Sequence, residues 1–163
     1  MRLLILILFC SSTAISQIGT GQWRLHIPAN KAVDVVAKSD RVFAAYENGL
    51  SEYGYSSNEL SIWNAVSGLS DITVTCLGNS LSNNAVFVGY ENGNLDKIKN
   101  NTVTNIPAIK LAQVQGSKRI NKIVEFDNHM YVATGFSIVK IDPIKNEVRD
   151  TYYPTNGNQS ILD

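Results

Sequence analysis

The chain has 163 residues, of which 44% are hydrophobic and 17% are charged, and its 14 basic side chains balance its 14 acidic ones. This length is typical of one domain. A zero formal charge argues against nucleic-acid binding, which usually requires a basic excess, so we expect no nucleic-acid partner.

The first 16 residues have the pattern of a signal peptide. Met1-Arg2 form a short positive segment, and residues 3–9 (LLILILF) form a seven-residue apolar run. Ala14 and Ser16 then provide small residues three and one before a cleavage site. The apolar run is too short to cross a bilayer, which takes about 20 residues. We therefore predict cleavage after residue 16, secretion across the inner membrane and no transmembrane segment.

The two cysteines lie on opposite sides of that cleavage site. Cys10 raises the alternative of a lipoprotein signal, but Phe9 stands where a small residue normally precedes a lipid-modified cysteine. After cleavage, Cys76 is the only cysteine and cannot form an internal disulfide. Because Cys76 lies in an apolar, strand-like stretch, we predict a buried and unreactive thiol.

The mature sequence contains an internal repeat of 44 residues. Residues 41–49 (RVFAAYENG) match residues 85–93 (AVFVGYENG), and a second shift of 44 reaches residues 129–134 (HMYVAT). Repeats of about 40–50 residues with strand-like content are typical of propeller blades. No amphipathic run with a period of 3.6 residues accompanies them, which disfavours a helical repeat.

Each repeat divides into four short stretches with the alternation expected of strands. After a signal peptide at 1–16 and an extended segment at 17–32, we predict a partial β-propeller at 33–163, with blades at about 33–64, 73–106 and 120–153. The fold class is all-β, with three four-stranded antiparallel blades and almost no helix. The strands are predicted at 33–37, 41–46, 50–54 and 60–64, then 73–78, 85–90, 94–98 and 102–106, then 120–126, 129–134, 137–142 and 147–153.

Turn chemistry separates these strands. We predict type I′ hairpins at Asn48-Gly49 and Asn92-Gly93, because Asn-Gly tolerates the positive φ that both central positions need. Three blades do not close a ring, since propellers have about 4–8. We therefore expect the outer faces of the first and third blades to be apolar and uncovered, and the chain to associate through them.

Two resemblances follow from these segments. Residues 68–74 (GLSDITV), followed by 86–90 (VFVGY) and Gly93, resemble the two-component-regulator propeller repeat, although Ser67 and Phe87 stand where that repeat usually has Asn and Trp. A broader likeness covers nearly the whole mature chain, which resembles the PorZ-like propeller proteins of the Bacteroidetes type IX secretion system. The segments that carry this broader likeness are 22–32 (QWRLHIPANKA), 47–50 (ENGL), 66–71 (VSGLSD), 90–96 (YENGNLD), 135–139 (GFSIV) and 150–153 (DTYY).

This resemblance implies a role and a location. PorZ-like proteins belong to an outer-membrane attachment complex whose surface sortase joins secreted cargo to anionic lipopolysaccharide. By resemblance, we expect a non-catalytic scaffold that helps deliver that lipopolysaccharide, with the sortase and other attachment-complex proteins as partners, in the periplasm or at the outer-membrane surface of a Gram-negative bacterium. Because PorZ-like proteins are several times longer, we expect this chain to be a truncated form.

No catalytic, metal or cofactor site is predicted. His26 and His129 lack Cys or acidic neighbours at metal-ligand spacing, and we expect them to be packing or surface residues. The one charge asymmetry is the stretch from Lys97 to Val124, which contains no acidic residue. If the role implied by the resemblance applies, some surface must meet the anionic lipopolysaccharide, and we predict that Lys118, Arg119 and Lys122 form this ligand site, because lysine and arginine suit phosphate groups. The simpler interpretation is a solvated edge and loop.

Two rival functions share the predicted fold. A periplasmic ligand-sensing propeller of a hybrid two-component regulator has the same repeat, but the opening segment 22–32 favours the secretion protein. A propeller enzyme, such as a lyase or glycosidase, needs acidic or histidine clusters near its axis, and none is evident in the sequence.

Overall fold

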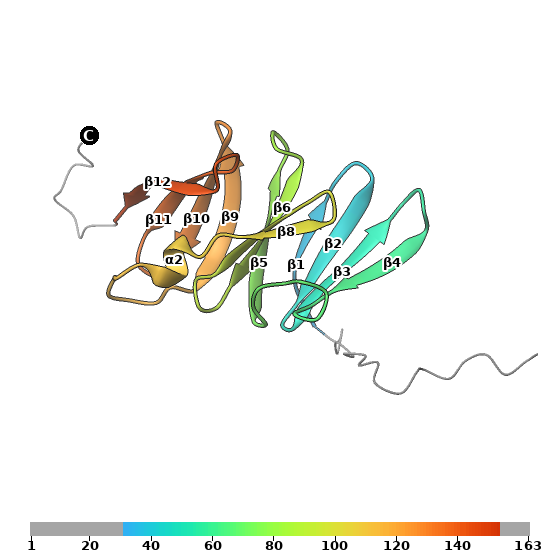
Figure 1. The fold of residues 1–163 in the computed structure, drawn as a ribbon, viewed down its shortest axis with the longest axis horizontal. Helices are drawn as coiled ribbons and strands as arrows, with labels where there is room; N and C mark the ends of the chain where they lie inside the picture. The colour runs from blue at the N-terminus through green and yellow to red at the C-terminus, as the bar shows by residue number, and fades with distance from the viewer. Residues whose placement is uncertain (1–30, 154–163) are drawn as a thin grey trace, which may run out of the picture.

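The computed structural model describes residues 31–153, which form three four-stranded antiparallel sheets. Figure 1 shows them as three blades standing side by side in chain order. The predicted all-β fold class is confirmed, and each strand begins and ends within two residues of its predicted range. The predicted signal peptide, most of the segment 17–32 and His26 lie outside the described residues. The strands are β1 (Ala32–Ala37), β2 (Arg41–Tyr46), β3 (Gly49–Gly54), β4 (Glu59–Trp63), β5 (Val74–Ser80), β6 (Ala85–Tyr90), β7 (Leu95–Lys99), β8 (Thr102–Asn105), β9 (Ile120–Phe126), β10 (His129–Thr134), β11 (Ile138–Asp142) and β12 (Glu147–Tyr152).

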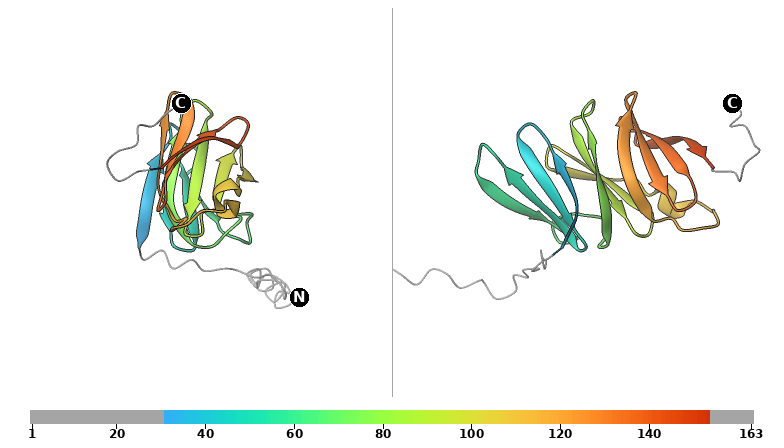
Figure 2. Two further views of the ribbon diagram at one scale, coloured as in Figure 1. Left: turned by 90° about the vertical axis from the view of Figure 1, so that its left-hand side faces the viewer. Right: turned by 180° about the vertical axis from the view of Figure 1, so that it is seen from behind.

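Each blade pairs its strands in sequence order, so its first strand and its fourth form the two edges. The first strands β1, β5 and β9 lie beside one another between blades, and we call them the inner strands. The views in Figure 2 show the blades fanning out from this side. The first blade comprises β1–β4, the second β5–β8 and the third β9–β12.

Two apolar clusters hold the blades together, because alternate residues of each strand point to opposite faces. Between the first and second blades, Phe43 and Leu50 pack with Val86 and Tyr90. Between the second and third blades, Phe87 and Leu95 pack with Met130, Val132 and Ile141. The second blade is therefore buried on both faces, and every residue of β6 is buried.

The predicted hairpin geometry is wrong at both Asn-Gly pairs. Gly49 and Gly93 have positive φ, at 151° and 84°, but neither Asn48 nor Asn92 does. In the second pair, the side-chain oxygen of Asn92 accepts a hydrogen bond from the backbone N–H of Asn94, which forms the turn without a left-handed asparagine. Two successive residues with positive φ occur instead at 100–101, between β7 and β8, and at 127–128, between β9 and β10.

The connection between the second and third blades contains one short helix, α2 (Ala108–Leu111). Ile109 of this helix is buried and joins the cluster between these two blades. Gly93 and Gly135 sit so close to the connection that an added Cβ at either would lie within 3.0 Å of Lys118 or Ser117. The connection therefore packs tightly over the β6–β7 and β10–β11 turns. Within residues 31–153, no helix is long and apolar enough to span a membrane.

Candidate ligand-binding site

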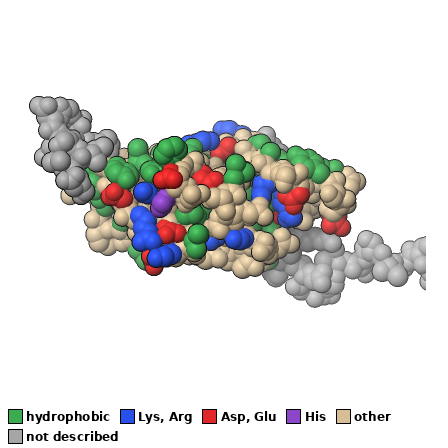
Figure 3. Space-filling model, turned by 90° about the horizontal axis from the view of Figure 1, so that it is seen from above, with side chains coloured by type: hydrophobic (Ala, Val, Ile, Leu, Met, Phe, Trp, Pro, Cys, Tyr) green, Lys and Arg blue, Asp and Glu red, His purple; other side chains and the backbone are tan. Residues whose placement is uncertain are grey.

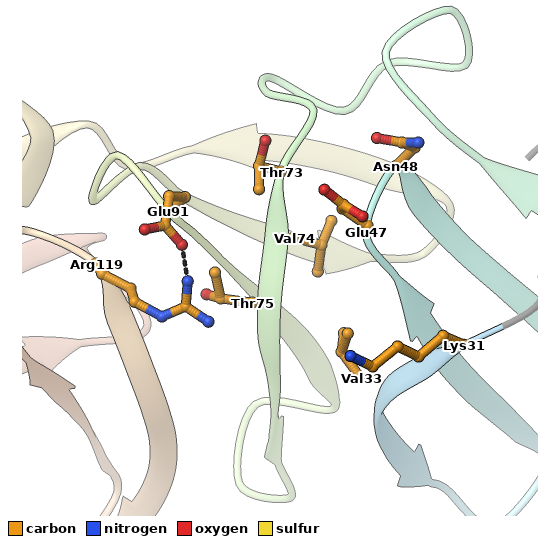
Figure 4. Close-up of a pocket in the computed structure, with 9 residues that line it drawn as sticks. All are labelled: Lys31, Val33, Glu47, Asn48, Thr73, Val74, Thr75, Glu91 and Arg119. Atoms are coloured by element: carbon orange, nitrogen blue, oxygen red, sulfur yellow. Dashed lines mark ion pairs between the residues drawn. The ribbon is translucent and has the colours of Figure 1, made fainter.

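A hollow of about 430 Å³ lies where the inner strands begin, between the first and second blades and the start of the third. Figure 4 shows side chains from three blades pointing around this space. It is lined by Lys31, Val33, Glu47, Asn48, Thr73, Val74, Thr75, Glu91 and Arg119.

One wall comes from equivalent positions of successive blades. Lys31, Thr73 and Arg119 each directly precede the first paired residue of an inner strand. After that first paired residue, each inner strand has a β-bulge, in which one residue is left out of the pairing with the second strand of the blade. The unpaired residues are at positions 33, 75 and 121. Such bulges bend a strand and redirect its side chains, and they are frequent beside functional sites. The repeat thus builds the same bend into every blade at the mouth of the hollow.

The opposite wall comes from two turns that are tied to β5. The backbone N–H of Val74 donates to the carbonyl oxygen of Glu47 at 2.9 Å, and the N–H of Glu91 donates to the carbonyl oxygen of Thr73 at 3.0 Å. These bonds fix the β2–β3 and β6–β7 turns against the start of the inner strand. Two carboxylate-bearing turns are therefore held at the rim of the hollow.

The charges in the hollow are mixed. Arg119 forms an ion pair with Glu91, and both side chains are nearly half exposed. Within the part of the chain that the structure describes, neither Lys31 nor Glu47 has an ion-pair partner. The hollow therefore presents an amine, a carboxylate and a guanidinium beside threonine hydroxyls and the Asn48 amide, which suits a hydroxylated ligand with charged groups.

The structure does not gather the three predicted site residues into one patch. Arg119 lines the hollow, but the amine of Lys118 donates to the carbonyl oxygen of Lys110 at 2.8 Å. Lys122 lines a second, shallower hollow along the inner strands, and its amine lies 3.7 Å from the carboxylate of Asp34. As expected from strand alternation, Lys122 is exposed while Ile123 is buried. The anionic-ligand site at these residues stays a prediction.

Acidic residues from elsewhere in the fold meet the basic stretch between residues 97 and 124. Lys110 pairs with Asp71 at 2.9 Å, in addition to the pairs made by Arg119 and Lys122. Lys97 is buried, and its amine donates to the carbonyl oxygen of Pro143 in the third blade at 2.6 Å. Burial, and then the nearby charge of Lys99, lower the pKa of Lys97. At the opposite end of the blades, Figure 3 likewise shows acidic, basic and hydrophobic side chains intermixed.

The remaining reactive side chains have structural environments. Cys76 is 2% exposed, and burial raises the pKa of its thiol to about 11, in agreement with the predicted buried cysteine. A ring nitrogen of His129 lies 2.7 Å from the backbone oxygen of Asp127. Trp63 packs against the cluster between the first two blades and donates to the carboxylate of Glu52. Among residues 31–153, no group of three His, Cys, Asp or Glu side chains is placed to hold a metal ion.

Of the residues that line the hollow, only Arg119 was predicted from the sequence as a site residue, although the repeat itself pointed to two others. Glu47 and Glu91 occupy the same position in the two copies of the Tyr-Glu-Asn-Gly segment, at residues 46–49 and 90–93. Lys31 and Thr73 could not be recognised, because the repeats are offset by 42 and 46 residues at the inner strands instead of 44. Those offsets follow from insertions between blades, which a fixed period does not reveal.

Comparisons with known proteins give one family and one fold. A family model described as the N-terminal β-propeller domain of PorZ, of the type IX secretion system, matches residues 42–162. The search of curated proteins found no match. The solved structure of PorZ from Porphyromonas gingivalis, described as an essential bacterial surface component of that system, is 29% identical with a TM-score of 0.70. The alignment covers 75% of this chain and 17% of the PorZ chain, so this chain spans a small part of that relative's length.

Other solved propellers share the fold at lower identity. Two structures of the extracellular domain of BT4673 from B. thetaiotaomicron, described as a putative hybrid two-component and a putative one-component system, are each 20% identical, with TM-scores of 0.62 and 0.65. They cover 76% and 81% of this chain, and 17% and 18% of their own chains are matched. At this identity the likeness concerns the fold alone.

Proposed function

Because the chain belongs to the family of PorZ N-terminal β-propeller domains of the type IX secretion system, we propose that it is a non-catalytic propeller scaffold in that system. The observation that carries the proposal is the family match over residues 42–162, together with the PorZ fold found at 29% identity. The proposed location is the periplasm or the outer-membrane surface, and the proposed protein partners are the surface sortase and other attachment-complex proteins.

Within this role, we propose that the chain helps deliver anionic lipopolysaccharide to the sortase, and that Arg119 makes the principal contact. Arg119 stands at the rim of the hollow, where a guanidinium can bind a phosphate or carboxylate through two parallel hydrogen bonds. The hydroxyls of Thr73 and Thr75 and the amide of Asn48 line the same space and suit sugar hydroxyls. Lys118 and Lys122 do not line this hollow, so they are assigned secondary, longer-range contributions.

The alternative is a ligand-sensing propeller of a hybrid two-component regulator. The BT4673 extracellular domains share the fold at 20% identity, which does not distinguish the two roles. The family match favours export, so we retain sensing as the outcome to be tested against.

The experiment is a pull-down of purified anionic lipopolysaccharide by the secreted chain. Wild type is compared with a Lys118→Glu, Arg119→Glu, Lys122→Glu triple variant and with Arg119→Glu alone. Lys145→Glu is the matched control, because Lys145 is exposed in the β11–β12 turn at the far end of the blades. Circular dichroism first verifies that all four proteins have the same strand content.

We expect binding by wild type and by the Lys145 control at low salt, a clear loss with Arg119→Glu and a further loss with the triple variant. Added salt should weaken wild-type binding, because screening shortens the field of exposed charges to about 8 Å at physiological ionic strength. Equal binding by all four proteins would place the ligand elsewhere on the chain. Absence of binding by wild type would contradict the lipopolysaccharide role.

A further inference from the structure

The hollow lies where the blade repeat lacks one of its ion pairs. The ladders make Thr73, which precedes β5, the equivalent of Arg119, which precedes β9. They also make Glu47, which follows β2, the equivalent of Glu91, which follows β6. Between the second and third blades, Arg119 forms an ion pair with Glu91. Between the first and second blades, the same two positions hold a threonine and a glutamate, so this ion pair cannot form.

The backbone still holds position 73 beside the turn that carries Glu47. The N–H of Val74 donates to the carbonyl oxygen of Glu47 at 2.9 Å, so the residue that follows Thr73 is bonded to this turn. Figure 4 shows Glu47 beside Thr73 on one side of the hollow, and the pair of Arg119 and Glu91 on the other. Because a threonine side chain is much shorter than an arginine side chain, space remains beside the carboxylate of Glu47.

The carboxylate of Glu47 is available to a cationic group of a ligand. Glu47 is exposed, and among residues 31–153 no basic side chain pairs with its carboxylate. Hydrogen bonds from a cationic donor to a carboxylate are about twice as strong as those between neutral groups. The equivalent carboxylate, that of Glu91, meets the guanidinium of Arg119. The group that suits Glu47 best is therefore an ammonium or a guanidinium.

Lys31 provides the opposite charge in the same hollow. Figure 4 shows its amine pointing into this space near Val33. The amine forms no ion pair with Glu47 or with any other carboxylate of the described segment 31–153. A lysine amine binds phosphate as a point charge. Two opposite charges that line one hollow without neutralising each other suit a ligand that carries both charges itself.

We propose that the hollow binds a zwitterionic group in which a primary amine stands beside a phosphate, with the amine on the carboxylate of Glu47 and the phosphate on the amine of Lys31. The inference rests on the proposed function in one respect, namely that this hollow is the ligand site, and it adds the chemical class of the group that is recognised. The hydroxyl of Thr73 and the amide of Asn48 line the same space and can bond to sugar hydroxyls. An amino sugar phosphate thus matches each kind of side chain in this part of the hollow.

Size and charge both favour this class of ligand. The volume of about 430 Å³ is within the range of about 300–1,000 Å³ that is usual for small-molecule sites. A phosphate without an amine leaves the carboxylate of Glu47 unpaired and facing a like charge, which selects against it. An exposed ion pair contributes little by itself, so the amine should improve binding only by about two- to fivefold.

The test compares matched sugar phosphates by nuclear magnetic resonance titration of the isotope-labelled chain from residue 17 onward. Glucosamine 6-phosphate carries the amine, glucose 6-phosphate has a hydroxyl in its place, and N-acetylglucosamine 6-phosphate has a neutral amide there. Wild type should bind the first about two- to fivefold more tightly than the other two. Ethanolamine phosphate, which has the same two charges without the sugar, separates the two sources of the group. Binding as tight as that of glucosamine 6-phosphate assigns a headgroup of the ethanolamine type, and weaker binding assigns an amino sugar.

Three variants assign the two charges to their residues. Glu47→Gln should abolish the preference for the amine. Thr73→Arg should abolish it as well, because the new guanidinium can pair with Glu47 as Arg119 pairs with Glu91. Lys31→Gln should weaken the binding of all three sugar phosphates and leave the preference for the amine in place.

Glu147→Gln and Lys145→Gln are the matched controls, because both side chains belong to the third blade and neither lines the hollow. Both should bind as wild type does, and circular dichroism verifies that every variant is folded. No binding by wild type, equal affinity for the three sugar phosphates, or a preference that survives Glu47→Gln or Thr73→Arg would overturn the inference. If the preference is absent while lipopolysaccharide still binds, this inference alone fails. If the preference is present while lipopolysaccharide does not bind, the proposed delivery role alone fails.

Discussion

Glu125 joins the third blade to the second, and its removal is the sharpest perturbation of blade packing that the structure offers. From β9, its carboxylate accepts hydrogen bonds from the hydroxyl of Ser80 at 2.8 Å and from the backbone N–H of Leu81 at 2.7 Å, and it also accepts from Ser82. Burial of the carboxyl opposes ionisation, but the hydrogen bonds from Ser82 and Ser80 outweigh it and lower the pKa of Glu125. The carboxylate form is therefore the one that stabilises this junction.

The variant Glu125→Gln keeps the shape of the side chain but replaces one acceptor oxygen by a donor amide. We expect a loss of about 1–2 kcal/mol in the free energy of unfolding at pH 7, around the lower limit of the range for charge-assisted bonds, because the site is partly exposed. The pKa of Glu125 is lower in the folded chain than its ordinary value of 4.5. The carboxylate therefore adds to the free energy of unfolding above pH 4.5, and this stabilisation is lost as the pH falls through the folded-state pKa. The difference between wild type and variant should therefore shrink on acidification.

Urea unfolding followed by circular dichroism at pH 7 and at acidic pH measures this difference. Glu147→Gln is the matched control, because Glu147 is exposed on the same blade. Equal stability of wild type and Glu125→Gln at pH 7, or a difference that persists unchanged in acid, would refute the assigned role of the carboxylate.

Three further predictions concern the blade interior. Gly78→Ala should destabilise the fold markedly, because an added Cβ would lie 2.4 Å from a methyl group of Ile123; the melting temperature reports this, and an unchanged value would contradict the inner-strand packing. Cys76 should resist iodoacetamide at pH 8 until urea unfolds the chain, since burial raises the pKa of its thiol to about 11; rapid labelling of the folded chain would show that the thiol is accessible. Asp96→Ala should cost about 1–3 kcal/mol in urea unfolding, because it leaves the buried hydroxyl of Tyr90 without its acceptor at 2.7 Å; a loss below about 1 kcal/mol would contradict that bond.

The fold could be predicted from the sequence because its signals are local and repeated. The alternation of Val42, Phe43 and Ala44 recurs at a fixed spacing, and each copy encodes one blade whose strands pair in order. The backbone conformation of the two Asn-Gly turns could not be predicted from the sequence. Asn92 makes a side-chain bond to Asn94 instead of adopting positive φ, and this choice depends on contacts around the turn.

The candidate site could be predicted only in part, because it forms between blades. The stretch around Arg119 looks uniformly basic in the sequence, but its partner Glu91 comes from a turn 28 positions earlier, on another blade. Lys122 likewise meets Asp34 of the first blade. Charge balance between repeats is set by how the blades stack, and the one-dimensional pattern does not contain it.

The role in type IX export is tested most directly by the state of the exported cargo. The measurement is the fraction of type IX cargo covalently joined to anionic lipopolysaccharide, in cells that carry and in cells that lack the gene encoding this chain. The account predicts that deletion releases cargo without lipopolysaccharide, that the wild-type gene restores attachment, and that Arg119→Glu restores it poorly. Unchanged attachment after deletion, with an altered transcriptional response to an external ligand, would contradict export and establish the sensing alternative.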